Sequence, residues 1–112
     1  MSQITTHVLD TSIGKPAEGV SIVLEQFING KWEKMANGRT NADGRISDLL
    51  PENKIVSEGI YQLVFDTYAY FNSLNIKTFY PKVAIAFEIT DSKHYHVPLL
   101  LNPFGYSTYR GS

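Results

Sequence analysis

The sequence predicts an all-β sandwich of two sheets, with seven to eight strands and one short helix. Three observations predict it. The chain of 112 residues has the length of one domain. Apolar and polar residues alternate with period two in several stretches, whereas helical periodicity is rare. Turn-forming residues separate these stretches at intervals of about 8–12 residues, which favours a sandwich over a fold of alternating strands and helices. We therefore expect one domain over residues 1–112.

Strands that bury one face place every second side chain in the core, so they read as alternating apolar and polar residues. This pattern indicates six strands, and a seventh is expected at the end of the chain. They are Ile4–Leu9, Val20–Phe27, Trp32–Asn37, Ile60–Asp66, Val83–Ile89, Tyr95–Leu101 and Gly105–Tyr109.

Turn-forming residues lie between the predicted strands. Asn29-Gly30, between Phe27 and Trp32, is a strong hairpin signal because both residues tolerate positive φ. The same reasoning predicts turns at Ile13–Pro16, Asn37-Gly38 and Asn41–Gly44.

One segment departs from the strand pattern. Thr67–Leu74 carries Tyr70, Phe71 and Leu74 at helical spacing, which predicts a short helix. Asp66 precedes it and is expected to be the N-cap, its carboxylate accepting from amides of the first turn.

Composition excludes several classes of function. The net charge is −1 and no basic stripe is present, so nucleic acid is not an expected partner. The absence of cysteine excludes disulfides, thiolate nucleophiles and cysteine-bound zinc. No apolar run of the length that a membrane span requires occurs. We expect a cytoplasmic protein, or a periplasmic one if a signal peptide was removed.

Histidine is the side chain best suited to proton transfer near neutral pH, and the chain has three: His7, His94 and His96. Strand alternation points His7 away from the face of Ile4 and Val8. His94 and His96 project from one common face. Each has a plain structural alternative, and the three together are an alternative zinc site.

Arg45 directly follows the Asn41–Gly44 turn, where its planar guanidinium is either a solvated charge or a bidentate ligand for a carbonyl group. The chain ends in Tyr109, Arg110, Gly111 and Ser112 directly after a predicted strand. That ending is either a plain edge strand with a tail or part of a site. The residues alone leave both questions open.

Five segments spread over essentially the whole chain form one pattern. They are T-H-V-L-D with a following G-K-P-A, then T-N-x-D-G-R, F-Y-P, H-Y-H-V-P-L-L-L and the ending Y-R-G-S. The pattern resembles the signature of 5-hydroxyisourate hydrolases of the transthyretin-like family, in which the Y-R-G-S ending separates hydrolases from thyroid-hormone carriers. Asn102 and Phe104 depart from the Ser and Tyr common in that family.

The resemblance implies a transthyretin-like β-sandwich that forms a homotetramer, a dimer of dimers, with active sites in the channel between dimers. It implies hydrolysis of 5-hydroxyisourate to 2-oxo-4-hydroxy-4-carboxy-5-ureidoimidazoline in urate degradation, without a cofactor or a metal. The family's catalytic residues fall on His7, Arg45 and His96, and substrate binding falls on His7, Arg45, Tyr109 and Ser112. His94 is outside that set.

The implied chemistry is attack of water on a ring carbonyl. One of His7 and His96 removes a proton from the water while Arg45 stabilises the oxyanion, and the sequence does not select the histidine. The alternative from another functional class is a non-catalytic carrier that binds small aromatic ligands in the same channel.

Overall fold

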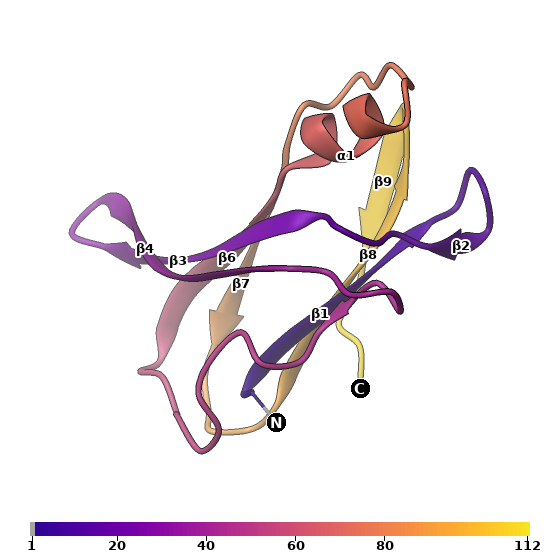
Figure 1. Ribbon diagram of the computed structural model, residues 1–112. Coiled ribbons are helices and arrows are strands. Elements are labelled where there is room, and N and C mark those ends of the chain that lie inside the picture. The colour runs from indigo at the N-terminus through magenta and orange to yellow at the C-terminus, as the bar shows by residue number, and fades with distance from the viewer. Residues whose placement is uncertain (1) are drawn as a thin grey trace.

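The computed structural model, which describes residues 2–112, shows two packed sheets (Figure 1). Burial alternates along their strands, because one face of each sheet lies in the core. One sheet has the order β2-β1-β8-β9, with β5 also pairing with β1, and the other has the order β4-β3-β6-β7. The strands are β1 (Ile4–Asp10), β2 (Lys15–Pro16), β3 (Ser21–Ile28), β4 (Lys31–Arg39), β5 (Arg45–Ile46), β6 (Gly59–Phe65), β7 (Val83–Ile89), β8 (Tyr95–Asn102) and β9 (Gly105–Thr108).

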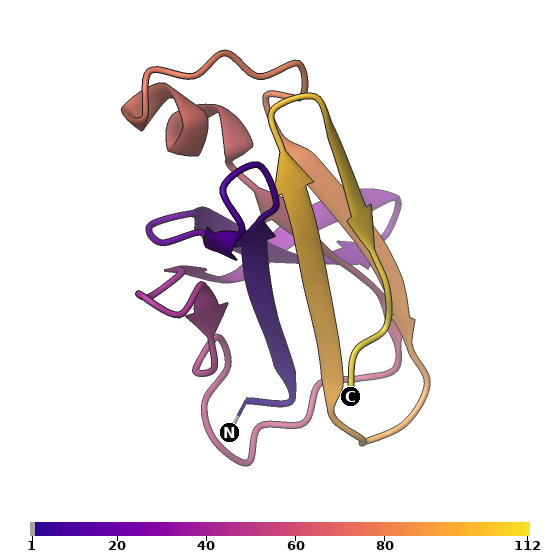
Figure 2. The same ribbon diagram turned by 90° about the vertical axis from the view of Figure 1, so that its right-hand side faces the viewer.

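The pairing of β1 with β8 sets the layout of the first sheet. These two strands run parallel, with Thr5 opposite His96 and His7 opposite Pro98. Strand β9 then pairs antiparallel with β8, and β1, β8 and β9 lie side by side (Figure 2). The first and the last strands of the chain are therefore in one sheet.

The core lies between the two sheets. Ile4 and Val8 of β1 and Leu99 of β8 are fully buried there. Burying one such side chain contributes about 1.5–3 kcal/mol relative to leaving it exposed. Opposite them, the second sheet supplies Ile22, Leu24, Leu63, Phe65 and Ile89. The inner face of β1 and β8 is thus held by packing, and their outer face is left for polar side chains.

The helix α1 (Thr67–Ser73) covers one end of the sandwich (Figures 1 and 2). As predicted, Asp66 is its N-cap and accepts from the amide of Ala69 at 3.0 Å. Tyr70 and Phe71 are buried, and the Tyr70 hydroxyl donates to the buried Asp10 carboxylate at 2.8 Å. Leu74, expected on the apolar face, is 45% exposed. Within residues 2–112, no helix is long and apolar enough to cross a bilayer.

The predicted strands are present, with bounds shifted by one or two residues in most cases. The hairpin at Asn29-Gly30 is also confirmed, because both residues adopt positive φ, 52° and 79°. The structure has nine strands within residues 2–112, more than the seven to eight expected. The two-residue strands β2 and β5, too short to show an alternation of their own, were missed.

The predicted turn at Asn37-Gly38 is wrong. Both residues lie inside β4, where Asn37 pairs with Val23 and Gly38 pairs with Ile22 of β3. The glycine has a packing role, since a Cβ atom at this position would lie 3.2 Å from the Ile46 side chain. Gly38 therefore lets β5 approach β4 closely.

Candidate active site

Two histidines from opposite ends of the chain meet on the outer face of β1 and β8. His7 Nδ1 lies 2.8 Å from His96 Nε2, a hydrogen-bonding distance. The two rings are stacked, with centroids 5.1 Å apart and planes inclined by 23°. The parallel register produces the contact, because it sets Thr5 opposite His96 and brings His7, two residues further along β1, diagonally across from it.

A threonine hydroxyl holds the other side of His96. Thr5 Oγ1 lies 2.7 Å from His96 Nδ1 and also 2.7 Å from His94 Nε2. His96 is 8% exposed and Thr5 is 6% exposed, whereas His94 is exposed. Both nitrogens of the buried imidazole are therefore engaged, one by each neighbour.

Both members of the histidine pair favour the neutral form. Burial is the main cause that lowers the pKa of His7, and the charge of Arg45 lowers it further. Burial also lowers the pKa of His96, with added contributions from His7, Arg45 and His94. Neutral imidazoles at neutral pH are the form that accepts a proton.

Arg45 reaches this face through the turn that precedes it. Arg45 pairs directly with His7 across β1 and β5, so the two side chains share a face with Cβ atoms about 4.5–5.5 Å apart. The turn is built by Asn41, whose Oδ1 accepts from the amides of Asp43 and Arg45. Gly44 adopts a φ of 71°, and a Cβ there would lie 2.5 Å from the carbonyl oxygen of Val8. Glycine is thus required to bring Arg45 against β1.

Three of the predicted residues, Arg45, His96 and Ser112, line a pocket of about 230 Å³ on this face. Its walls include the side-chain clusters described above and the end of the chain: Thr5, Thr6, Arg45, Ile46, Ser47, His94, His96 and Ser112. His7 is half-buried beside this wall, bonded to His96, and is not itself part of the lining. The pocket therefore combines a guanidinium, imidazoles and hydroxyl groups.

The tail reaches the pocket by lying along β8. The amide of Gly111 donates to the carbonyl oxygen of His96 at 2.9 Å. A Cβ at Gly111 would lie 2.6 Å from Cδ2 of His96 and 3.2 Å from the Pro98 ring. Glycine therefore allows the backbone to rest against the imidazole, and Ser112 follows into the pocket lining.

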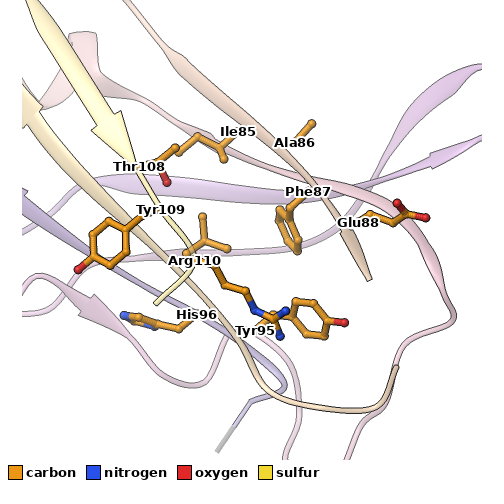
Figure 3. A pocket seen from close by; sticks show the side chains of 10 residues that line it. Ile85, Ala86, Phe87, Glu88, Tyr95, His96, Thr108, Tyr109 and Arg110 are labelled. Atoms are coloured by element: carbon orange, nitrogen blue, oxygen red, sulfur yellow. The ribbon is translucent and has the colours of Figure 1, made fainter. Parts of the chain in front are cut away.

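Tyr109 and Arg110 belong to a different pocket, of about 240 Å³, between β7, β8 and the tail (Figure 3). The Arg110 guanidinium lies 4.3 Å from the centre of the Tyr95 ring, a cation–π contact that fixes the tail. Tyr109 points away from that contact (Figure 3) and is 55% exposed. In one copy of the chain, Tyr109 does not line the pocket of Arg45 and His96.

The alternative zinc site can be tested against the positions of the three histidines. Within residues 2–112, no group of three His, Cys, Asp or Glu side chains has the arrangement of a metal site. Nδ1 of His7, Nε2 of His94 and both ring nitrogens of His96 contact one another or the Thr5 hydroxyl instead.

Of the residues predicted for the site, the structure gathers His7, Arg45, His96 and Ser112. Tyr109 lines the neighbouring pocket, which it shares with His96. Sequence reasoning missed Thr5 and placed His94 outside the catalytic set, with a part only in the alternative zinc site or a secondary role beside His96. Their shared strand faces with His7 and His96 were visible in the sequence, but the strand pairing that joins them was not.

Comparisons with known proteins agree over the full domain. The sequence model of the HIUase/Transthyretin family matches residues 4–111. The 5-hydroxyisourate hydrolase of Salmonella typhimurium is 47% identical over 110 residues, which are 97% of this chain and 80% of that protein. The 5-hydroxyisourate hydrolase of mouse is 43% identical over 114 residues, 99% of this chain and 96% of that protein.

Solved structures give the same result. The 5-hydroxyisourate hydrolase of Klebsiella pneumoniae superposes with a TM-score of 0.85 at 39% identity, covering 97% of this chain and 92% of that one. Sea bream transthyretin in complex with thyroxine superposes with a TM-score of 0.91 at 31% identity, covering 98% and 95%. The transthyretin-like sandwich is confirmed, and the chain belongs to the HIUase/Transthyretin family.

Proposed function

We propose that this protein hydrolyses 5-hydroxyisourate, with His7 as the general base, Arg45 as the oxyanion stabiliser and His96 as the partner of His7. The observation that carries the proposal is the hydrogen-bonded His7–His96 pair beside Arg45. The similarity to several proteins named 5-hydroxyisourate hydrolase supports this substrate. The product is 2-oxo-4-hydroxy-4-carboxy-5-ureidoimidazoline, a step of urate degradation.

The hydrogen bonds favour His7 over His96 as the base. Both ring nitrogens of His96 are engaged, Nδ1 by Thr5 and Nε2 by His7. His7 uses Nδ1 for His96, and no hydrogen bond to its Nε2 is found within residues 2–112. A base needs a free nitrogen within reach of the water it activates. Nε2 of His7 fulfils that condition.

The reaction follows from these positions. Nε2 of His7 takes a proton from water as the hydroxide oxygen adds to the ring carbonyl carbon, and the carbonyl oxygen becomes an anion. When the carbonyl re-forms, the bond from that carbon to the ring nitrogen breaks, and the nitrogen takes the proton of the added hydroxyl group, which leaves a carboxylate. The carbon becomes a carboxyl group and the nitrogen becomes part of the ureido group. The water oxygen and one of its hydrogens are retained in the product, and the other hydrogen leaves as the proton that His7 takes.

Arg45 stabilises the charge that develops on the carbonyl oxygen. Its guanidinium is always protonated, and it presents donors in a planar fork that fits a planar purine-derived ring. It lies on the same face as His7 and on the wall of the pocket. A fixed donor aimed at a developing oxyanion acts on the transition state more than on the substrate.

A homotetramer completes the site in this proposal. The outer face of β1 and β8 holds the polar residues, and Tyr109 of the tail is 55% exposed in a single copy. Packing a second copy over that face would exclude water from the pocket and strengthen the electrostatic interactions inside it. Tyr109 then binds substrate from the tail of one copy or its neighbour, as the family resemblance implies.

The test is the decay of 5-hydroxyisourate, generated from urate by urate oxidase and followed by its ultraviolet absorbance. The protein is expected to accelerate the decay. Arg45→Ala is expected to lower kcat by about a hundredfold or more, the usual cost of losing one preorganised donor. Arg39→Ala is the matched control, because that guanidinium donates to the carbonyl of Gly19 on another part of the molecule.

Near-normal turnover by Arg45→Ala would refute the role of Arg45. No acceleration by the unmodified protein, together with tight binding of thyroxine, would instead support the carrier alternative.

A further inference from the structure

We infer that Thr5 and His94 extend the His7–His96 pair into a proton wire that connects the pocket with solvent. The inference rests on the proposed hydrolase function. Its basis is an unbroken series of contacts: His7 to His96 at 2.8 Å, His96 to Thr5 at 2.7 Å and Thr5 to His94 at 2.7 Å. Neither Thr5 nor His94 touches the reacting atoms, so both act through His96.

The hydrogens that bridge these three contacts can be placed in two ways. In the first, Nδ1 of His7 donates to His96, Nδ1 of His96 donates to Thr5, and the Thr5 hydroxyl donates to Nε2 of His94. Nε2 of His7 is then bare and ready to accept from water. In the second arrangement every donor has become an acceptor, and Nε2 of His7 carries a proton. Both arrangements are neutral and satisfy all three contacts.

Transfer along the wire converts the first arrangement into the second. Water gives a proton to Nε2 of His7, whose Nδ1 proton passes to Nε2 of His96. The Nδ1 proton of His96 passes to Thr5, and the Thr5 proton passes to Nε2 of His94. His94 then carries a proton on each nitrogen and releases that on Nδ1 to solvent. Three hydrogens cross the three contacts, one proton enters from water at Nε2 of His7, and one proton leaves from Nδ1 of His94.

Burial gives the wire a direction. Thr5 and His96 are 6% and 8% exposed, so they have little access to bulk water, whereas His94 is exposed. A positive charge on His96 would be poorly hydrated and would lie near Arg45, and both effects lower the pKa of His96. His94 also lines a second pocket, with Lys54 and Ser92, so a charge that reaches His94 is hydrated from that side. The buried part therefore conducts a proton but does not hold it.

The proposed reaction also needs such an exit. Opening a ring amide yields a carboxylic acid and a ureido nitrogen, and a ureido nitrogen takes up no further proton near pH 7. Carboxyl groups have pKa values of about 4, so the product ionises and one proton per turnover must leave. The pocket already contains the Arg45 cation. The wire removes the proton without passing it through the substrate.

Charged groups surround the solvent end. Lys54 shares a pocket wall with His94 on one side, and Arg45 and Ser112 share a wall with it on the other. Lys93 is adjacent in the chain. Three of these four residues, Lys54, Arg45 and Lys93, are cationic.

The test compares Thr5→Val, Thr5→Ser and His94→Ala with the unmodified protein. Thr5→Val keeps the shape but lacks the hydroxyl, so kcat is expected to fall by about a hundredfold, the lower range for a positioned proton-transfer group. Thr5→Ser restores the hydroxyl and is expected to recover most of kcat. His94→Ala is expected to lower kcat by about tenfold with KM little changed, since water substitutes partly for the imidazole.

Two readouts separate a wire from a structural role. Added imidazole is expected to restore the kcat of His94→Ala in proportion to its concentration, because it replaces the missing proton acceptor. Ring ¹⁵N NMR is expected to show a changed protonation pattern at His96 and His94 in Thr5→Val, whatever the activity. Thr11→Val is the control, because the Thr11 hydroxyl donates to a β8 carbonyl instead of an imidazole.

Unchanged kcat in both Thr5→Val and His94→Ala, with the unmodified protein active, would overturn the wire and leave the hydrolase function standing. A loss in His94→Ala that imidazole does not restore would also overturn it. An inactive unmodified protein would refute the function first.

Discussion

The two faces of the β1–β8 pair differ in what fixes their side chains. On the inner face, Ile4, Val8 and Leu99 are fully buried and held by packing, which has no preferred direction. On the outer face, His7, Thr5 and His96 are held by directional hydrogen bonds at 2.7–2.8 Å. The two faces of one pair of strands are therefore held by different interactions, apolar packing on one face and directional hydrogen bonds on the other.

The division has a physical reason. An apolar face tolerates exchange of one apolar side chain for another of similar volume, because total volume decides most of its stability. A chain of hydrogen bonds tolerates no such exchange, since each member must both donate and accept. We expect substitutions on the two faces to change different observables.

The largest effect is expected from His7→Ala on the outer face. Loss of the base should lower kcat/KM by about 10²–10⁴, the range for general acid–base catalysis. The free energy of unfolding should change by less than about 1 kcal/mol, because His7 is half-buried and water can replace it as partner of His96. Steady-state kinetics and urea unfolding check both. Activity within tenfold of that of the unmodified protein would refute the role of His7 as the base.

Leu99→Ala tests the inner face. Leu99 is fully buried in the core, so its truncation should cost about 2–5 kcal/mol of unfolding free energy. At temperatures where the variant remains folded, kcat/KM should stay close to that of the unmodified protein. Urea unfolding at a fixed protein concentration measures the first quantity. A stability equal to that of the unmodified protein would show that packing does not hold this face.

The smallest effect is expected in the dependence of kcat/KM on pH. Since burial and Arg45 lower the pKa of His7 below its ordinary value of 6.5, the base stays neutral further into the acid range. The kcat/KM should therefore fall only below pH 6.5, as His7 becomes protonated. In Arg45→Gln the residual activity should fall at a higher pH, because one cause of the lowering is removed. A profile whose acid limb does not move would argue against an electrostatic link between Arg45 and His7.

Local sequence patterns predicted most of the fold because one-sided burial imposes a period of two on each strand. Val83–Ile89 matches β7 in both bounds, and Asp66 caps the helix as expected. The wrong turn at Asn37-Gly38 shows the limit of local signals. Asn-Gly favours a turn by itself, but pairing with β3 and the approach of Ile46 override that preference.

The site was predictable only in part. His7, Arg45 and His96 were identified through a family resemblance, and the structure brings them onto one face. The roles of Thr5 and His94 depend on a register between strands separated by about ninety residues, and no local pattern encodes such a register. Gly111 belongs to the Y-R-G-S ending, but the reason for a glycine there, close contact with the His96 ring, depends on the tertiary structure.

The parallel alignment of β1 with β8 also has a consequence for biosynthesis. Their paired residues run from Ile4 with Tyr95 to Asp10 with Leu101, so the first strand must wait for the eighth to leave the ribosome. Until then β1 has no partner on that side, and closing so long a loop is slow compared with forming a hairpin. Reactivity should consequently emerge last during synthesis, and nascent chains stalled before β8 should be inert.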